Sequence, residues 1–400
     1  MRWSRVAVLV VCSALALSPL PGASAAGRVP RVIPAWPLCG RWTNTATPAV
    51  DGDATYFDIE VVDPWHAYAL GARLTVRKQL WRPLVALWDG WRWTSMPAPR
   101  KGTDVTDLAV VSPNEIWAVG EHKVRIDGDR HWRPAAWRFN GKRWTKVRVP
   151  SPGYGDSEFQ AVTVIPGTRQ LWAVGTHYAS VGGWPSRPSP VAMRWNGRRW
   201  REASMPELQR AAMLRDVTAV DRRMVWAVGT AMWPWQTEGG ASLLMRFSGG
   251  RWRTVRSPDI GVLDEVGGGG ARDALAAGWF AGVLRWNGER WSKIPHRRLP
   301  GSARLRPQGV AFSMEGTAWI AGNLRRGQDP NDAESYVPVA YHRTSSGWVR
   351  TMVRRVGSPI SVAAIDAATR HDVWVVGNVG VFGGSILDPV DAAPIAQHWC

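Results

Sequence analysis

The four residues Trp226-Ala227-Val228-Gly229 decide how this sequence folds, because the chain repeats them. Copies follow one another roughly every 50 residues, a period typical of repeats built from a small sheet. They are Trp117-Ala118-Val119-Gly120, Trp172-Ala173-Val174-Gly175, Trp319-Ile320-Ala321-Gly322, Trp374-Val375-Val376-Gly377 and, in weaker form, Tyr68-Ala69-Leu70-Gly71 and Leu275-Ala276-Ala277-Gly278. Seven copies indicate seven units.

A second motif follows the first in most units and predicts a hairpin. Its clearest forms are Trp195-Asn196-Gly197-Arg198-Arg199-Trp200 and Trp286-Asn287-Gly288-Glu289-Arg290-Trp291. Asn-Gly and Asp-Gly favour tight turns with positive φ, so each copy joins two strands. Close variants begin at Trp88, Phe139 and Phe247.

Each unit therefore contains four strands, named a to d along the chain. In the unit around Trp226 the expected strands are residues 216–220, 224–229, 243–247 and 251–256. Helical periodicity is absent, and four-stranded units at this period predict a β-propeller. We expect an all-β protein, a seven-bladed β-propeller with four-stranded antiparallel blades. The 27 tryptophans, against 7 Phe and 6 Tyr, would pack between neighbouring blades.

The two ends of the chain predict how the ring closes. The seventh unit stops at Cys400 without a strand d, and Cys39-Gly40-Arg41-Trp42-Thr43 resembles the strand that is missing. Aligning Trp42 with Trp200 and Trp399 with Trp195 places the two cysteines at neighbouring positions of one cut turn. We therefore expect the N-terminal strand to complete the last blade, with a disulfide between Cys39 and Cys400.

The N-terminus has the features of a Sec-type secretory signal. Arg2 and Arg5 precede an apolar stretch at residues 6–17, and Ala23-Ser24-Ala25 forms a small-residue cleavage site. We expect residues 1–26 to be a signal peptide, residues 27–38 a Pro-rich linker and residues 39–400 a single propeller. The expected location is outside the cell, with no transmembrane segment, and we expect a monomer.

The chain is strongly basic, with 50 Lys and Arg against 32 Asp and Glu. The signal holds two arginines and no acid, so the rest keeps a net charge of +16. A positive excess bears on solubility and on anionic partners rather than on the fold.

The repeat resembles those of β-propellers secreted by actinobacteria and related bacteria, over residues 39–400. More distantly it resembles kelch/galactose-oxidase propellers and the Asp-box propellers of sialidases. The full Asp-box is absent, and Asp89-Gly90 is the pair most similar to it. The resemblance implies the fold but not a function, since propellers host many functions. Copper-radical oxidases need a cysteine cross-linked to a tyrosine, and here both cysteines of the mature chain are assigned to closure.

The long and varied b–c loops are where a ligand site is expected. Exposed aromatic side chains among polar groups suit sugar stacking or protein contact, although the same side chains could simply pack the loops down. The ligand-binding candidates are Trp132, Tyr178, Trp184, Trp233, Trp235 and Tyr336. Nearby polar residues are His122, His131, His177, Asp329, Asp332, Glu334, Asp388 and Asp391.

Two further patterns concern cations. Strand c carries a recurring cation that could stack on Trp or pair with an acid near strand a such as Asp107, Asp216 or Asp264; these cations are Arg138, Arg194, Arg246, Arg285, His342 and His398. Strand d is basic, which either protects the edge from aggregation or forms a rim for an anionic polymer. Its cations are Arg143, Lys146, Arg148, Arg198, Arg199, Arg201, Arg251, Arg253, Arg256, Arg350, Arg354 and Arg355.

Catalytic motifs are missing from the sequence. G-x-S-x-G and H-E-x-x-H do not occur, the eight histidines lack metal-ligand spacing, and Gly267–Gly270 is not followed by a helix. We expect no cofactor, no metal and no specific nucleic-acid partner. The function predicted is a non-catalytic extracellular binding protein for carbohydrate, an anionic cell-wall polymer or a protein on the b–c loop face. The alternative is a carbohydrate-active enzyme, a glycoside hydrolase or lyase, with a site near the central axis.

Overall fold

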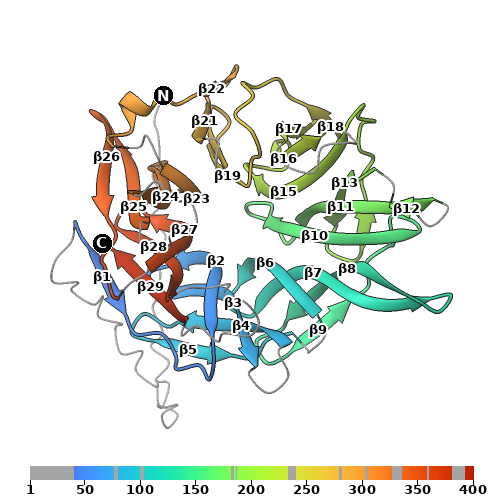
Figure 1. The fold of residues 1–400 in the computed structure, drawn as a ribbon, viewed down its shortest axis with the longest axis horizontal. Coiled ribbons are helices and arrows are strands. Elements are labelled where there is room, and N and C mark those ends of the chain that lie inside the picture. The colour runs from blue at the N-terminus through green and yellow to red at the C-terminus, as the bar shows by residue number, and fades with distance from the viewer. Residues whose placement is uncertain are drawn as a thin grey trace, which may run out of the picture. The chain divides into compact units, whose positions relative to one another are not determined.

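The repeat folds into a ring of seven four-stranded antiparallel blades, as predicted (Figure 1). The computed structural model describes residues 40–75, 80–99, 103–181, 184–185, 187–232, 240–278, 282–301, 305–326, 336–357, 360–380 and 392–400. These residues belong to one unit, residues 36–400. The expected signal peptide, the expected linker and Cys39 lie outside the described residues.

The first four blades follow the chain in order, each from its innermost strand a to its outermost strand d. Blade 1 comprises β2 (Ala54–Asp63), β3 (His66–Thr75), β4 (Leu80–Trp88) and β5 (Trp93–Met96). Blade 2 comprises β6 (Thr103–Ser112), β7 (Glu115–Ile126), β8 (Asp129–Phe139) and β9 (Trp144–Val147). Blade 3 comprises β10 (Gly155–Val164), β11 (Leu171–Val181), β13 (Ser189–Trp195) and β14 (Trp200–Glu202), with β12 (Trp184–Pro185) paired to β11. Blade 4 comprises β15 (Ala211–Ala219), β16 (Val225–Met232), β17 (Ala241–Ser248) and β18 (Arg251–Thr254).

The last three blades complete the ring. Blade 5 comprises β19 (Glu265–Gly270), β20 (Asp273–Gly278), β21 (Gly282–Trp286) and β22 (Trp291–Lys293). Blade 6 comprises β23 (Leu305–Phe312), β24 (Ala318–Arg325), β25 (Tyr336–Thr344) and β26 (Gly347–Met352). Blade 7 comprises β27 (Ile360–Thr369), β28 (Asp372–Val379), β29 (Ala393–Trp399) and β1 (Trp42–Thr45).

The predicted strands of blade 4 are present, but three of the four are longer at one or both ends than the sequence pattern suggested. In the described part of the chain the one helical segment is a short 3-10 turn, η1 (His296–Arg298). None of the described residues belongs to a helix long and apolar enough to cross a membrane.

The N-terminal strand closes the ring as expected. Trp42 pairs with Trp399 in the register that Trp200 keeps with Trp195. We name the pairing of β1 with β29 the seam. Side-chain hydrogen bonds stabilise it further, because the hydroxyl groups of Thr43, Thr45 and Thr47 each donate to a main-chain carbonyl of β29. The amide of Gly40 also donates to the carbonyl of Cys400. The chain next to Cys39 thus lies beside Cys400, while the disulfide itself stays a prediction.

The core consists of apolar clusters between neighbouring blades, and a tryptophan anchors most of them. Trp117 of blade 2 lies with its ring 4.7 Å from Trp195 and edge-on to Trp200, both of blade 3. The same three-ring arrangement joins blades 3 and 4, 4 and 5, 6 and 7, and 7 and 1, through Trp172, Trp226, Trp319 and Trp374. The abundance of Trp is therefore structural.

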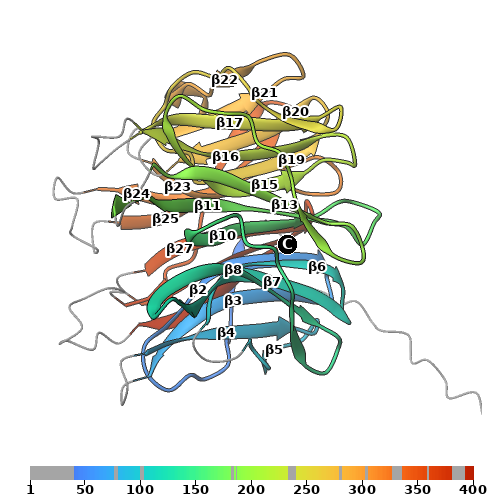
Figure 2. The same ribbon diagram turned by 90° about the vertical axis from the view of Figure 1, so that its right-hand side faces the viewer.

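The strands run from one face of the ring to the other (Figure 2). Because each blade is antiparallel, the a–b and c–d turns lie on one face, which we name the turn face. The b–c loops and the d–a links lie on the opposite face, which we name the loop face. The two faces and the outer edges are where ligands could bind.

Candidate functional site

A set of cations surrounds a pocket in an outer groove between blades 3 and 4. One pocket, of about 540 Å³, lies against the rings of Trp172, Phe247 and Trp252. Four arginines line it: Arg194, Arg201, Arg251 and Arg253. Its single acidic lining residue is Glu202.

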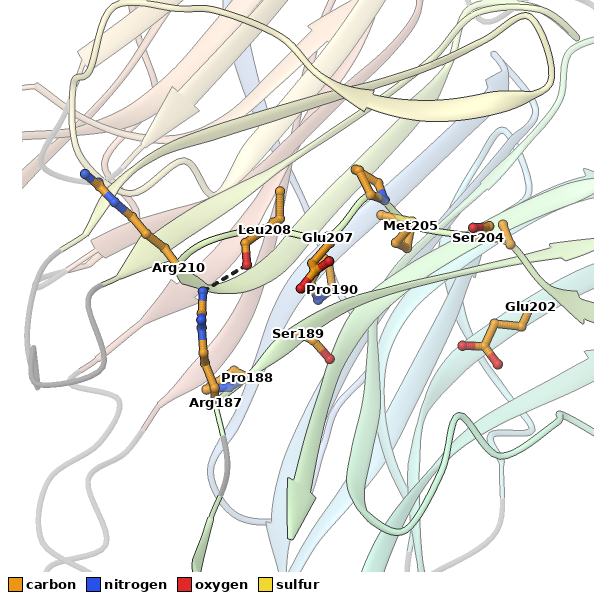
Figure 3. A pocket seen from close by; sticks show the side chains of 12 residues that line it. Arg187, Pro188, Ser189, Pro190, Glu202, Ser204, Met205, Glu207, Leu208 and Arg210 are labelled. Carbon is orange, nitrogen blue, oxygen red and sulfur yellow. Dashed lines mark hydrogen bonds between the residues drawn. The ribbon is translucent and has the colours of Figure 1, made fainter. Parts of the chain in front are cut away.

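A second pocket, of about 470 Å³, continues the groove towards the loop face, on the other side of residues 202–206 (Figure 3). Arg187 and Arg210 lie at one end of it and Glu202 at the other. The guanidinium of Arg187 donates to the carbonyl of Leu208 at 2.9 Å, so the d–a link holds this side chain in place. Glu207 also lines the second pocket, so that pocket has two arginines and two glutamates, and the excess of cations lies in the first pocket.

The arginines of the groove come from repeat positions, which explains why they gather there. Arg194 belongs to the recurring strand c cations, and it stacks over Trp172 with its guanidinium carbon 5.8 Å from the ring centroid. It also donates to Gln170 at 2.6 Å, while its Nε atom is buried without a partner. Arg201, Arg251 and Arg253 stand on the exposed outer strands β14 and β18. The first pocket therefore offers guanidinium N–H groups that can donate hydrogen bonds to an anion.

The strand c cations elsewhere stack on a Trp, as one prediction allowed. Arg138 and Arg246 lie over Trp117 and Trp226, at 5.9 and 5.7 Å. The paired acids, however, are not the ones that the sequence suggested. They stand at the start of strand b, and the pairs are Arg138–Glu115 at 2.9 Å, Arg285–Asp273 at 3.1 Å and His398–Asp372 at 2.7 Å.

The acids near strand a instead face the central axis and join neighbouring blades. Asp58 accepts the amide of Leu108 at 3.1 Å, and Asp107 accepts that of Val162 at 2.6 Å. Asp216 and Asp366 do the same for Val266 and Val61, both at 2.6 Å. Each contact satisfies an amide on the inner edge of the next blade, which has no further strand to bond.

Removal from water raises the pKa of every carboxyl group in this axial cluster. The pKa of Asp216 and that of Asp366 rise to about 7, and in both the nearby charge of Asp58 adds to the effect of burial. Burial and neighbouring carboxylates also raise the pKa values of Glu60 and Glu265 well above normal. Burial likewise raises the pKa of Asp58 and that of Asp107, and the charge of Asp58 adds to the effect on Asp107.

The predicted aromatic residues fall at three places. Trp132 is half-buried on β8, with the ammonium of Lys123 4.3 Å from its ring centroid. Tyr178 donates to Glu158 at 3.3 Å, and Tyr336 lies under the guanidinium of Arg306 at 4.9 Å. Trp184 lies on β12, but its side chain is outside the described residues, as are Trp233 and Trp235.

Asp156 links two of these candidates, and sequence reasoning missed it. Its Oδ1 atom accepts the amide of Trp132 at 3.1 Å and lies 3.0 Å from Nδ1 of His131. Asp156 also pairs in register with Tyr178. The neighbouring Ser157 bonds Nδ1 of His177 at 2.8 Å, but both side chains are buried. The basic run of strand d predicted a rim for an anionic polymer as one alternative, but it could not locate the groove, because the groove forms only where two blades meet.

Comparison with known proteins supports the fold alone. No protein-family model and no curated protein matches the sequence. Among solved structures, an acylaminoacyl peptidase of Pyrococcus horikoshii aligns with 86% of this chain and 51% of its own, at 9% identity and a TM-score of 0.51. A Trypanosoma rangeli sialidase in complex with sialic acid aligns with 89% of this chain and 58% of its own, at 9% identity and a TM-score of 0.50. YCF48 bound to D1 peptide aligns with 90% of this chain and 95% of its own, at 12% identity and a TM-score of 0.48. This chain therefore spans little more than half the length of the two enzymes that it resembles in fold.

Proposed function

We propose that the protein is a non-catalytic binding protein that holds an anionic glycan polymer of the cell envelope in the groove between blades 3 and 4. The observation that carries the proposal is the pocket lined by Arg194, Arg201, Arg251 and Arg253. Guanidinium groups bind carboxylate and phosphate through two parallel hydrogen bonds, so such a pocket favours repeating anions. The predicted signal peptide agrees with a ligand outside the cell.

The shape of the groove supports a polymer rather than a small ligand. Both pockets have residues 202–206 in their lining, so they adjoin, and a polymer long enough to occupy both would contact the arginines of each. Exposed cations continue on the outer edge of blade 2, at Arg143, Lys146 and Arg148. Among the described residues, these three side chains form no ion pair. The proposal moves the expected contact from the b–c loops to the outer edge.

Binding of the protein to a teichoic acid, to polygalacturonate and to neutral dextran tests the proposal. We expect binding to at least one of the two anionic polymers, no binding to dextran, and an affinity that falls steeply with salt. The variant R201Q/R251Q/R253Q should lose more than tenfold in affinity. The matched control R350Q/R354Q/R355Q removes three cations from and just beyond the outer strand of blade 6, and should change affinity little. Equal losses in both variants would show unspecific attraction and contradict the groove.

The enzyme alternative has one observation in its favour, the neighbouring carboxyl groups of Asp58 and Asp107 at the axis, whose pKa values are both raised by burial. Pairs of carboxyl groups carry out glycoside hydrolysis. Both groups, however, already bond main-chain amides of strand a, which supports a structural role. Release of reducing ends from the bound polymer, abolished by D107N, would favour the enzyme instead.

A further inference from the structure

The c–d turns carry an exposed arginine at the same position of six blades, directly before the first Trp of strand d. Gly347 takes this position in blade 6. The six residues are Arg41, Arg92, Arg143, Arg199, Arg251 and Arg290, which we name the turn arginines. Because the blades surround an axis, the turn arginines lie around the rim of the turn face.

Local hydrogen bonds fix the backbone of this position. The side chains of Asp89, Asn140, Asn196 and Asn287 each accept the amide of the turn arginine three residues later, at 2.9 to 3.0 Å. The following Trp points into the core, so the arginine points to solvent. Within the described ranges none of the six side chains enters an ion pair. Their charge is available to a partner.

Most acids of the turn face are already engaged. Asp89 and Asp221 accept turn amides, Asp63 bonds His66, and Glu315 accepts the amide of Arg370. Glu115 and Asp273 are each paired with two arginines. Further cations stand in the same turns, namely Lys142, Arg198, Arg222, Arg223 and Arg272. These carboxylates keep their negative charge, but the arginines and lysines of the turns outnumber them, so the turn face is positive.

Two large apolar side chains project from this basic face. Trp91 is 66% exposed in the c–d turn of blade 1, and Met314 is 77% exposed in the a–b turn of blade 6. The equivalents of Trp91 in other blades are Lys142, Arg198, Gly250 and Glu289, so the fold sets no packing requirement there. A tryptophan at such a place gains free energy only when a partner covers it.

We propose that the turn face docks on the surface of a lipid bilayer that contains anionic lipid. Lysine and arginine close to such a surface are attracted by its negative potential, and tryptophan is enriched at the boundary between headgroups and acyl chains. An anionic polymer would satisfy the arginines, but it offers no apolar layer for Trp91 and Met314. This inference does not depend on the groove: Arg251 belongs to both sites, but the other five turn arginines do not line the groove.

Flotation with vesicles tests the inference. The probes are vesicles of neutral phosphatidylcholine and vesicles that also contain about 30% anionic phosphatidylglycerol. The two kinds of vesicle differ in surface charge. We expect binding to the anionic vesicles only. The variant R92Q/R143Q/R199Q should lower the partition coefficient about a hundredfold, and W91A roughly tenfold, with partial recovery in W91F.

The matched control is R125Q/R130Q/R148Q, which removes three exposed cations of blade 2 on or towards the loop face. It should change the partition coefficient less than about threefold, because those charges stay more than a Debye length from the bilayer. Absence of binding to anionic vesicles, or equal losses in both triple variants, would overturn the inference. So would an unchanged W91A together with full displacement by a soluble polyanion, which would assign the face to a polymer. The groove variant R201Q/R253Q should still float, which separates this test from that of the proposed function.

Discussion

At the scale of single residues, the glycine of the repeated tetrapeptide is explained by a bulge in the neighbouring strand. Opposite Gly229, the register of strand a shifts between Leu214 and Asp216. The carbonyl of Met213 then lies so close that no Cβ atom fits at Gly229. Gly71, Gly120, Gly175, Gly322 and Gly377 repeat this contact. The sequence pattern located these glycines, but the bulge that requires them is a property of two paired strands and could not be read from one.

Replacing Gly229 by alanine should therefore destabilise the protein by about 3 kcal/mol, because the main chain of strand a must move. Thermal or denaturant unfolding measures the change. The control is G197A, where φ is +94° and nothing lies within 4 Å of the added methyl group. That change should cost only about 1 kcal/mol, from the positive φ. Equal costs for the two variants would mean that the close approach to Met213 is unimportant.

The bulge also explains where the acids of strand a lie. Asp58, Asp107 and Asp216 directly follow the shifted residue, and each reaches the inner edge of the next blade. The sequence showed a recurring acid near strand a but suggested a partner on strand c. The strand c arginine takes its acid from the start of strand b instead, as Arg138 does with Glu115. Whether the strand c arginine pairs with the acid of strand a or with that of strand b depends on the direction in which each side chain points from its strand.

At the scale of elements, the closing strand was the best predicted feature and the b–c loops the least. The alignment of Trp42 with Trp200 gave the correct pairing of β1 with β29, because the aromatic pair recurs in other blades. The glycine run at residues 267–270 forms the end of strand a in blade 5, directly before the a–b turn. Its reason came only from the structure, since Phe312 of blade 6 packs where Gly269 would carry a side chain. The b–c loops have no repeat to guide a prediction.

The closing strand should contribute strongly to stability through Trp42, which is 4% exposed and contacts Trp319 and Trp399. We expect W42A to cost about 3–5 kcal/mol, the usual range for a buried aromatic residue. Calorimetry measures the shift in melting temperature. W91A serves as the control, because that ring is exposed, and it should stay within about 0.5 kcal/mol of the parent. A mild W42A would show that the ring does not depend on this seam.

At the scale of the whole molecule, the two signs of charge are separated. Acidic side chains gather around the axis, at Asp58, Glu60, Asp107, Asp216, Glu265 and Asp366, whereas arginines occupy the outer strands and turns. The outside is therefore more positive than the net charge alone would suggest. The composition predicted a basic protein with anionic partners, but only the ring shows that several acidic side chains lie at the axis, where raised pKa values favour their neutral form.

This separation predicts how stability depends on pH. The axial carboxyl groups have a higher pKa folded than unfolded; for Asp216 and Asp366 the change is from 3.8 to about 7. The folded state therefore binds more protons between these values, so stability should fall as the pH rises from about 4 to 7 and then level off. His122, His177 and His342, whose pKa values are lowered by burial, act in the opposite direction below pH 6.5.

Denaturant unfolding at several pH values, compared between the parent protein and D216N, isolates the axial contribution. The asparagine cannot titrate, so the slope of stability against pH should become shallower by up to about one proton between pH 4 and 7. D259N, at an exposed position on the d–a link of blade 4, is the control and should leave the slope unchanged. A parallel pH profile for D216N and the parent would disprove the raised pKa.

The pairing of β1 with β29 also makes closure of the ring wait until residues 393–399 have been synthesised. Trp42 leaves the ribosome long before its partner Trp399. A chain interrupted before residue 396 would keep an unpaired sheet edge at one end and a strand without a sheet at the other, and such edges invite aggregation. Incomplete chains should therefore expose unpaired strands that complete chains do not expose, and proteases and chaperones can recognise these strands.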